Sequence, residues 1–320
     1  MEKPPLIILT GPTAVGKTEI STALAKAVNG EIISADSMQV YKHMNIGSAK
    51  IHPEEMAGIP HHMIDILEPT EDFNVVTFQQ YAKKCIHQIL SRGHVPILVG
   101  GTGFYIQSVL YDIDFTENEE NTSYRQELEK LAFEKGNQYL HEKLASVDPK
   151  AAQDIHANNV RRIIRALEFY ELTGTRISEH NEAERKKDSA YSSCYFVLND
   201  DREKLYERID ARVDQMLSDG LIAEVKKLLA MGCKRSDTAM QGLGYKEILD
   251  YLNGEITLER AIYLIKRDTR HFAKRQLTWF RREKEVIWIN KPDFDYFSQR
   301  IIDYMVDCFE KRKGKEIEKD

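Results

Sequence analysis

The segment GPTAVGKT, residues 11–18, restricts the possible folds of this chain more than any other feature. It has the GxxxxGK[ST] spacing of a phosphate-binding P-loop, and it joins an apolar run at residues 6–9 to a helix-like stretch. In such loops backbone N–H groups and a helix N-terminus surround an anion, Lys17 adds a positive charge, and the Thr18 hydroxyl is suited to ligate Mg²⁺. The sequence therefore predicts phosphate binding without naming the ligand. The expected contacts are Gly11, Pro12, Thr13, Ala14, Val15, Gly16, Lys17 and Thr18.

Apolar strand candidates recur along the chain with helix-period segments between them, which favours an α/β fold of the P-loop NTPase-like kind, a parallel sheet flanked by helices. They lie at residues 6–9, 31–35, 95–99, 195–198 and 286–289. Between about residues 114 and 188 the strand signal disappears and the composition becomes polar and helical. We expect a helical insertion domain at 114–190, with the α/β core formed by 1–113 and 191–320.

The composition limits the classes of partner and compartment. The net charge of -6 over 320 residues gives no general affinity for nucleic acid, so a nucleic-acid partner would need a local basic patch. No apolar segment approaches the roughly 18 residues of a membrane span, and we expect a cytoplasmic protein without a membrane anchor. The four cysteines form no CxxC pair and are expected to be free thiols. Without an extended apolar face or heptad pattern, a monomer is expected.

A second polar group follows the strand at residues 31–35. Asp36 comes just past the strand end, and ligands of open α/β sheets bind at that edge. Ser37, Met38 and Gln39 follow in an irregular segment. An acid here can hold Mg²⁺ through water or act as a general base, and the residues alone leave these two roles equally open.

A third turn, VGGTGFY at residues 99–105, follows another apolar strand. Its three glycines imply close backbone approach, either of a ligand or of another chain segment, and Thr102 offers a hydroxyl at the same sheet edge. The location at this edge favours the ligand.

Seven motifs together resemble those of the tRNA dimethylallyltransferases, enzymes that prenylate tRNA. They occur in the order GPTAVGKT, ISADSMQVYK, PHHMIDI, VGGTGFY, NNVRRIIRALEFYELTG, AMQGLGYKEI and TRHFAKRQLTWFRR, and cover nearly the whole chain. The resemblance implies transfer of a dimethylallyl group from dimethylallyl diphosphate to N6 of the adenosine 3′-adjacent to the anticodon, with Mg²⁺ as cofactor. It also implies that Asp36 takes the N6 proton, that Thr102 orients the base, and that Lys17 stabilises the leaving diphosphate.

The tRNA anticodon stem-loop then requires the basic patch that the net charge does not supply. Arg267, Arg270, Lys274 and Arg281 are expected on one helix face without an acid, and Arg161, Arg162 and Arg165 on another helix whose Ile163 packs inward. Both faces can equally be solvated surface. The resemblance assigns tRNA contact to Asn159, Val160, Arg161, Arg162 and Ile163, and to residues 274–281, including Lys274, Arg275, Gln276 and Arg281. Further tRNA contacts are expected at Asp36, Ser37, Met38, Gln39, Thr102 and Arg165. Arg125 and Arg212 are weaker candidates, Arg125 for tRNA and Arg212 for the diphosphate.

Three other functions remain as alternatives from the residues alone. A P-loop kinase would pass phosphate from ATP to a small molecule, and a GTPase-like switch could use NKPD at residues 290–293 for guanine. A non-catalytic RNA-binding module is the third, although the intact P-loop argues against it. His61 and His62 are expected in a loop, hydrogen-bonded rather than holding metal.

Overall fold

The computed structural model describes residues 3–115 and 123–317, which form two compact units. The first unit comprises residues 1–110 and 190–320, and the second residues 111–189, where an insertion at 114–190 was expected. The first unit contains a six-stranded sheet in the order β3-β2-β4-β1-β5-β6, with every pair parallel. Its strands are β1 Pro5–Thr10, β2 Gly30–Ser34, β3 His61–His62, β4 Val95–Gly100, β5 Ser192–Asn199 and β6 Val286–Asn290.

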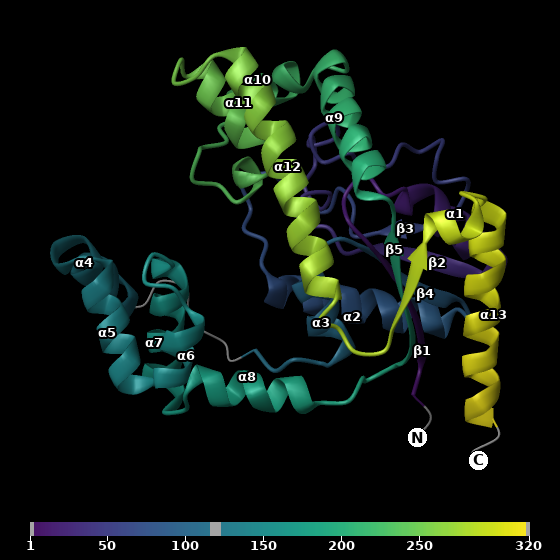
Figure 1. The fold of residues 1–320 in the computed structure, drawn as a ribbon, viewed down its shortest axis with the longest axis horizontal. Coiled ribbons are helices and arrows are strands. Elements are labelled where there is room, and N and C mark those ends of the chain that lie inside the picture. The colour runs from purple at the N-terminus through teal and green to yellow at the C-terminus, as the bar shows by residue number, and fades with distance from the viewer. Residues whose placement is uncertain (1–2, 116–122, 318–320) are drawn as a thin grey trace. The chain divides into compact units, whose positions relative to one another are not determined.

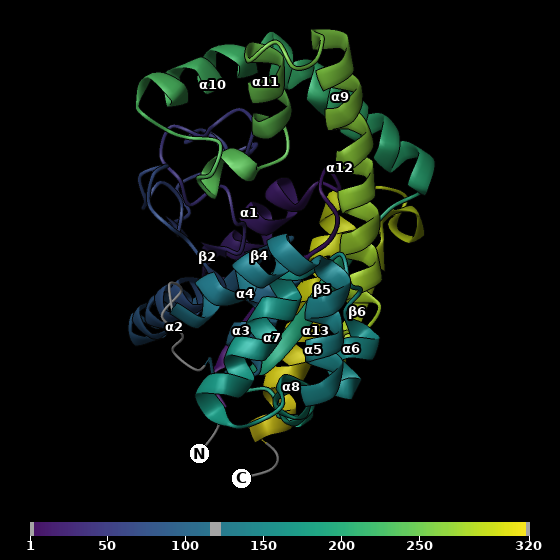
Figure 2. The same ribbon diagram turned by 90° about the vertical axis from the view of Figure 1, so that its left-hand side faces the viewer.

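Helices cover both faces of this sheet (Figure 1), which confirms the expected parallel α/β architecture. On one side α1 and α13 pack together, and on the other α2 contacts β2, β4 and α3. The helix α12 runs along α9 and α11 (Figure 2). The helices of this unit are α1 Lys17–Val28, α2 Val75–Ser91, α3 Gly103–Leu110, α9 Arg202–Ser218, α10 Leu221–Ala230, α11 Tyr245–Leu252, α12 Leu258–Phe280 and α13 Ser298–Ile317, with 3₁₀ turns at Ala239–Gln241 and Lys291–Phe294.

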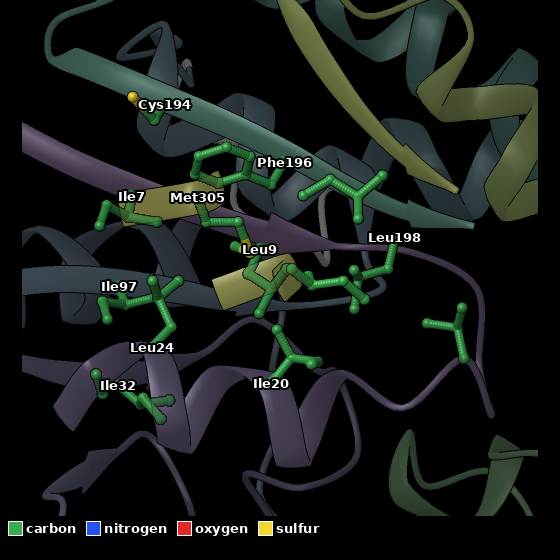
Figure 3. Packing of buried hydrophobic residues seen from close by; sticks show 14 of the residues in the cluster. Ile7, Leu9, Ile20, Leu24, Ile32, Ile97, Cys194, Phe196, Leu198 and Met305 are labelled. Carbon is green, nitrogen blue, oxygen red and sulfur yellow. The ribbon is translucent and has the colours of Figure 1, made fainter. Parts of the chain in front are cut away.

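Buried aliphatic side chains hold α1 and α13 against the sheet. In Figure 3, Ile20 and Leu24 of α1 point toward Leu9 of β1 and Ile97 of β4, and Met305 of α13 joins the same cluster. All five of these side chains are almost completely buried. Because neighbouring β1 residues such as Leu6 and Ile8 are also fully buried, the central strands are covered on both faces, as parallel strands require.

The strand β3 corrects one expectation. His61 and His62 were expected in a loop, but they pair in parallel with Ile32 and Ile33 of β2 and form a short edge strand. His62 Nε2 lies 2.7 Å from the buried Glu31 carboxylate, and His61 Nδ1 lies 2.8 Å from the Ile59 carbonyl. The histidines therefore have internal hydrogen-bond partners, as expected, while attaching the long segment after β2 to the sheet edge.

Among the described residues of the second unit, all regular secondary structure is helical. Its core contains Leu128, Leu140, Leu144, Ile163 and Leu167. The helix α7 ends where the sequence predicts, because Gly174 adopts φ 68°, a left-handed conformation that costs glycine little. The helices are α4 Ser123–Lys135, α5 Asn137–Val147, α6 Pro149–Asp154, α7 Val160–Thr173 and α8 Ile177–Lys186.

Candidate active site

The P-loop connects the end of β1 to the first turn of α1, as its sequence predicts. Gly11 has φ 146°, and a Cβ there would lie 2.5 Å from the Leu198 carbonyl oxygen of β5. Gly16 has φ 94° and occupies the N-cap of α1 without a capping side chain. Both positions therefore require glycine, and the N-terminus of α1 faces the loop with its positive dipole end.

Three charged side chains converge at this loop. The Lys17 ammonium donates hydrogen bonds to the Gly11 and Pro12 carbonyls, both at 2.9 Å. Burial, together with the positive charge of Arg212, lowers the pKa of Lys17 to about 7, while Asp36 acts in the opposite direction. Burial also lowers the pKa of Arg212, against the attraction of Asp36 and Glu55. Arg212, a weak candidate from sequence, thus lies near Lys17, and two desolvated cations next to a ring of amides favour a polyanion such as a diphosphate.

Side chains from three distant segments brace the P-loop. Thr13 N–H donates to Gln276 Oε1 at 2.9 Å, and Arg208 Nε donates to the Ala14 carbonyl at 3.0 Å. Lys291 Nζ donates to the Val15 carbonyl at 3.3 Å. The loop is therefore held by α12, by α9 and by the segment after β6.

Lys291 belongs to the NKPD tetrapeptide, which was one reason to consider a guanine site. Asn290 instead accepts a hydrogen bond from Asn199 Nδ2 and donates one to Asp293, both at 3.0 Å. The tetrapeptide here makes contacts within the protein and supports the P-loop.

Asp36 directly follows β2 and forms a tight turn with the next residues. Its Oδ1 accepts hydrogen bonds from Met38 N–H at 2.8 Å and Gln39 N–H at 3.3 Å. Among the described residues, no hydrogen bond engages Asp36 Oδ2, which leaves one carboxylate oxygen for a substrate. Gln39 accepts from Ser34 Oγ at 3.1 Å and donates to the Ser48 and Ala49 carbonyls, so its amide stabilises this segment. Ser37 is half-buried beside Asp36.

The glycines of the turn after β4 are explained by other chain segments rather than by a ligand. A Cβ on Gly100 would lie 2.2 Å from the Ala35 carbonyl oxygen, and a Cβ on Gly101 would lie 2.1 Å from Gln276 Nε2. A Cβ on Gly103 would lie 2.2 Å from the Trp279 ring. Of the two alternatives for these glycines, the structure shows the close approach of other chain segments, although their location had favoured a ligand. Trp279 of α12 packs against Gly103 of this turn.

Thr102 itself is placed next to the Asp36 segment. Its backbone N–H donates to the Ala35 carbonyl at 3.3 Å, and its own carbonyl accepts from Tyr105 N–H in the first turn of α3. Because β2, β4 and β1 are adjacent, Asp36, Thr102 and the P-loop all follow the carboxyl ends of neighbouring strands. This is the edge at which open α/β sheets bind ligands.

The outer face of α12 carries exposed cations at a hollow of about 420 Å³. Lys274 and Arg275 line it as the sequence suggests, and Arg281 is exposed just after the helix. Thr278 and Trp279, which also line it, lie within the expected stretch 274–281. Sequence reasoning missed two further lining residues, although their spacing of three and four from the others along the chain is the signal that finds them. These are His271 and Arg282.

Three expectations for α12 need correction. Gln276, expected to contact tRNA, is 6% exposed and uses both ends of its amide in internal hydrogen bonds. The arginines nearer the start of the helix were expected on a face without acids. Arg270 pairs instead with Asp210 of α9 at 2.5 Å, and Arg267 pairs with the adjacent Asp268 at 2.7 Å. The basic face is therefore shorter than predicted.

In the second unit, the cations at the start of α7 are exposed. Arg161 and Arg162 are exposed, as is the N-cap residue Asn159. Val160 and Arg165 are half-buried. Ile163 is fully buried in the core of this unit, so its side chain is not available to a ligand.

Arg125 of α4 forms a two-pronged ion pair within the second unit. Its Nε and a terminal nitrogen donate to the Glu168 carboxylate at 2.9 and 2.6 Å. Glu168 is 2% exposed, so its charge requires a partner. This arrangement accounts for Arg125 within the fold of the unit.

Comparison with known proteins decides the family. The sequence model of the family described as IPP transferase matches residues 39–283, most of the chain. The chain belongs to the IPP transferase family. The match includes the GGTG turn and α12, and it begins at Gln39, three residues after Asp36.

Several relatives within the IPP transferase family are similar over almost their whole length. The chain is 62% identical to a tRNA dimethylallyltransferase of Lachnoclostridium phytofermentans over 91% of this chain and 93% of that protein. It is 56% identical to one of Carboxydothermus hydrogenoformans, over 93% and 96% respectively.

Solved structures agree with the family assignment. The crystal structure of a tRNA isopentenylpyrophosphate transferase from Bacillus halodurans matches with a TM-score of 0.74 and 46% identity, covering 98% of this chain and 99% of that one. A eukaryotic dimethylallyltransferase, described as acting on tRNA, matches with a TM-score of 0.80 and 31% identity, covering 93% and 78%.

The donor set of this IPP transferase family member fits a Mg²⁺ ion shared with a phosphate ligand. Among the described residues, no group of three or more acidic, histidine or cysteine side chains can hold a metal by itself. Thr18 is exposed at the start of α1, and Mg²⁺ commonly combines one or two protein oxygens with phosphate oxygens and water. Within the same part of the chain, no helix has the length and apolar character needed to cross a membrane.

Proposed function

We propose that this chain transfers the dimethylallyl group of dimethylallyl diphosphate to N6 of the adenosine 3′-adjacent to the anticodon in tRNA. Its relatives are named tRNA dimethylallyltransferases, and the chain resembles them along nearly its whole length. The observation that carries the proposal is the meeting of the P-loop, Asp36 and Thr102 at one edge of three adjacent strands. A phosphate-binding loop beside a carboxylate suits a reaction in which diphosphate leaves and an amine loses a proton.

The diphosphate is the leaving group, so the protein must stabilise negative charge that grows as the carbon–oxygen bond breaks. Backbone N–H groups of the P-loop, together with Lys17 and Arg212, provide donors and positive charge for this purpose. Lys17 leaves the Gly11 and Pro12 carbonyls and turns toward the anion. Mg²⁺, when bound, supplies further charge neutralisation, and the Thr18 hydroxyl would hold it together with the diphosphate.

Asp36 acts on the acceptor. The N6 lone pair is delocalised into the adenine ring, so the amine is a weak nucleophile until its proton is removed. N6 forms a bond to the first carbon of the dimethylallyl group, the bond from that carbon to the diphosphate oxygen breaks, and the N6 proton passes to Asp36 Oδ2. Asp36 Oδ1 remains fixed by Met38 and Gln39 N–H, and Thr102 orients the base.

The adenine must leave the anticodon-loop stack to present N6 to the donor carbon, and loop nucleotides are unstacked more easily than paired ones. We assign the RNA contact to the outer face of α12, with Lys274, Arg275 and Arg281, and to the exposed start of α7, with Asn159 and Arg161. Both of these helix surfaces are exposed and basic in a protein of net negative charge.

The test is transfer of label from radioactive dimethylallyl diphosphate to an unmodified anticodon stem-loop in the presence of Mg²⁺. Wild type is expected to label the RNA, and Asp36→Asn to lower kcat by about 10²–10⁴-fold with both substrates still bound. Asparagine retains the Oδ1 acceptor for the two backbone N–H groups, so the turn survives. A stem-loop with purine riboside at the target position lacks N6 and should accept no label.

The parallel arm of this experiment uses γ-labelled ATP in place of the prenyl donor. Phosphate transfer from ATP, with no prenyl transfer, would make the protein a kinase and overturn the proposal. Near-normal turnover of Asp36→Asn would remove the general-base role while leaving the reaction itself in place.

A further inference from the structure

One side-chain amide connects the P-loop to the turn that carries Thr102. Gln276, in the last full turns of α12, accepts a hydrogen bond from Thr13 N–H through Oε1 at 2.9 Å. Its Nε2 donates to the Gly101 carbonyl, also at 2.9 Å. Because the side chain is 6% exposed, water does not compete strongly for these two hydrogen bonds.

The chemistry of this bridge is specific to an amide. One end must accept from a backbone N–H and the other must donate to a backbone carbonyl. A carboxylate provides only the first contact, and an ammonium only the second. The bridge therefore fixes the separation of Thr13 and Gly101, which lie on loops after the adjacent strands β1 and β4.

Thr13 N–H belongs to the loop expected to enclose the diphosphate. In the structure its hydrogen bond is directed to α12, so the position of the P-loop backbone depends on where α12 carries Gln276. Conversely, an anion that orders the P-loop also orders Gln276 and the helix that holds it.

The same end of α12 also contacts the turn around Thr102. Gln276 occupies the space beside Gly101, and Trp279, about one helical turn further on, occupies the space beside Gly103. Thr102 lies between these two contacts. On the outer side of the same helical turns, Lys274 and Arg275 are exposed at the basic hollow.

We infer that Gln276 is a positioning residue that couples occupation of the P-loop to binding of RNA on α12. This inference rests on the proposed function, since it takes diphosphate and the anticodon stem-loop as the two ligands. The physical link is a buried amide, hydrogen-bonded at both ends, on the helix whose opposite face carries the RNA-binding cations. Each ligand orders the same bridge. The second ligand to bind therefore loses less conformational entropy than it would if it bound alone.

The test measures the dissociation constant of the anticodon stem-loop with and without saturating inorganic diphosphate and Mg²⁺. In wild type the diphosphate is expected to tighten stem-loop binding by about 5–10-fold, a typical coupling between two sites. Gln276→Met keeps the volume but removes both hydrogen bonds. It is expected to bring this ratio close to 1, with each ligand's separate affinity changed by less than about threefold.

The control variant is Gln215→Met, which removes an exposed amide from α9 outside the site. It should keep the wild-type ratio. Gln276→Glu is a second variant, because a carboxylate can accept from Thr13 N–H but cannot donate to Gly101. This variant should also lose the coupling, and it replaces Gln276→Met in the test if Gln276→Met does not fold.

Two results would overturn the inference: a wild-type ratio of 1, or a folded Gln276 variant with the full wild-type ratio. The wild-type ratio needs no variant, so a folding failure does not prevent a decision. Absence of prenyl transfer by wild type would instead count against the proposed function. Failure of the coupling inference and failure of the proposed function are therefore distinguishable. A purely structural role of Gln276 would lower stability but leave the ratio unchanged.

Discussion

The Glu224 carboxylate accepts a hydrogen bond from the Tyr245 hydroxyl at 2.7 Å, which joins α10 to α11. The same carboxylate accepts from the backbone N–H groups of Asn45, Ile46 and Gly47 at 2.8–3.1 Å. Gly47 lies directly against the Tyr245 ring, where a Cβ would be 2.5 Å from it. The irregular segment that begins at Asp36 is therefore anchored by two helices from the C-terminal half of the chain.

Glu224→Ala should loosen this segment. The substitution leaves three backbone N–H groups and a phenol without their acceptor, and we expect the free energy of unfolding to fall by about 2–3 kcal/mol. Prenyl transfer should slow as well, because Asp36 lies in the same segment. Urea denaturation and turnover measure the two effects. Glu207→Ala, at an exposed position of α9, is the matched control and should change neither by much.

Removal of Lys274 and Arg275 charges should weaken RNA binding in a salt-dependent way. The double variant with glutamine at both positions is expected to reduce the slope of log affinity against log salt by about 0.7 per lost phosphate contact. Stem-loop titrations at several salt concentrations give the slope. Replacing Arg300 and Lys311 of α13 by glutamine removes the same charge elsewhere and should leave the slope unchanged. Equal slopes for wild type and the α12 variant would refute RNA contact at this face.

Arg212→Gln should weaken donor binding. The guanidinium lies near Lys17 and Asp36 and provides positive charge for a diphosphate, so we expect its removal to raise the Kd for dimethylallyl diphosphate by about tenfold or more. Isothermal titration with the donor and Mg²⁺ measures this. Arg202→Gln, on an exposed position of the same helix, is the control. An unchanged donor Kd would return Arg212 to the status of a surface charge.

Glu283 should make stability depend on pH. Burial raises its pKa from 4.5 to about 7, against the opposing effect of hydrogen bonds such as that from Gln107 at 2.7 Å. Between pH 4.5 and 7 the folded state keeps a proton that the unfolded state has lost, so this residue lowers stability as pH rises through that window. Glu283→Gln keeps a hydrogen-bond acceptor without the charge.

The variant is therefore expected to gain about 2 kcal/mol over wild type above pH 7 and almost nothing near pH 4. Thermal unfolding of both proteins across this range provides the measurement. A difference that does not change with pH would mean that Glu283 is ionised equally in the folded and unfolded states.

Arg125→Met should destabilise the second unit, because it leaves Glu168 buried without its two-pronged partner. A loss of about 3–5 kcal/mol is expected for a broken buried pair. Lys130→Met on the same helix removes only an exposed pair with Glu134 and should cost less than about 0.5 kcal/mol. The double variant with methionine at 125 and 168 should recover stability. If it still binds the stem-loop like wild type, Arg125 makes no contact with RNA.

Sequence patterns were sufficient to predict those parts of the fold and site that depend on consecutive residues. The P-loop spacing, the apolar strand before it and the helix after it predicted the loop and the parallel sheet, because local backbone geometry and phosphate binding require those residue types. Asp36 and Thr102 were found by their place just after apolar strands. The motifs also indicated the family, which the comparisons confirm.

Tertiary structure decided what each of these segments contacts. Three glycines in the GGTG turn indicate close approach, but whether Ala35, Gln276 and Trp279 or a ligand makes that approach depends on packing between distant segments. In the same way, a basic helix face cannot show from its own sequence that Arg270 meets Asp210 of another helix.

The sequence by itself therefore determined the phosphate loop, the parallel α/β class and the residues at the carboxyl edge of the sheet, since periodicity and short-range spacing encode them. Only the folded chain showed that Gln276 bridges the P-loop and the GGTG turn, and that Glu224 anchors the segment after Asp36. These contacts join residues far apart in sequence. In the sequence these residues are amides and carboxylates like many others. Packing buries them and selects their hydrogen-bond partners.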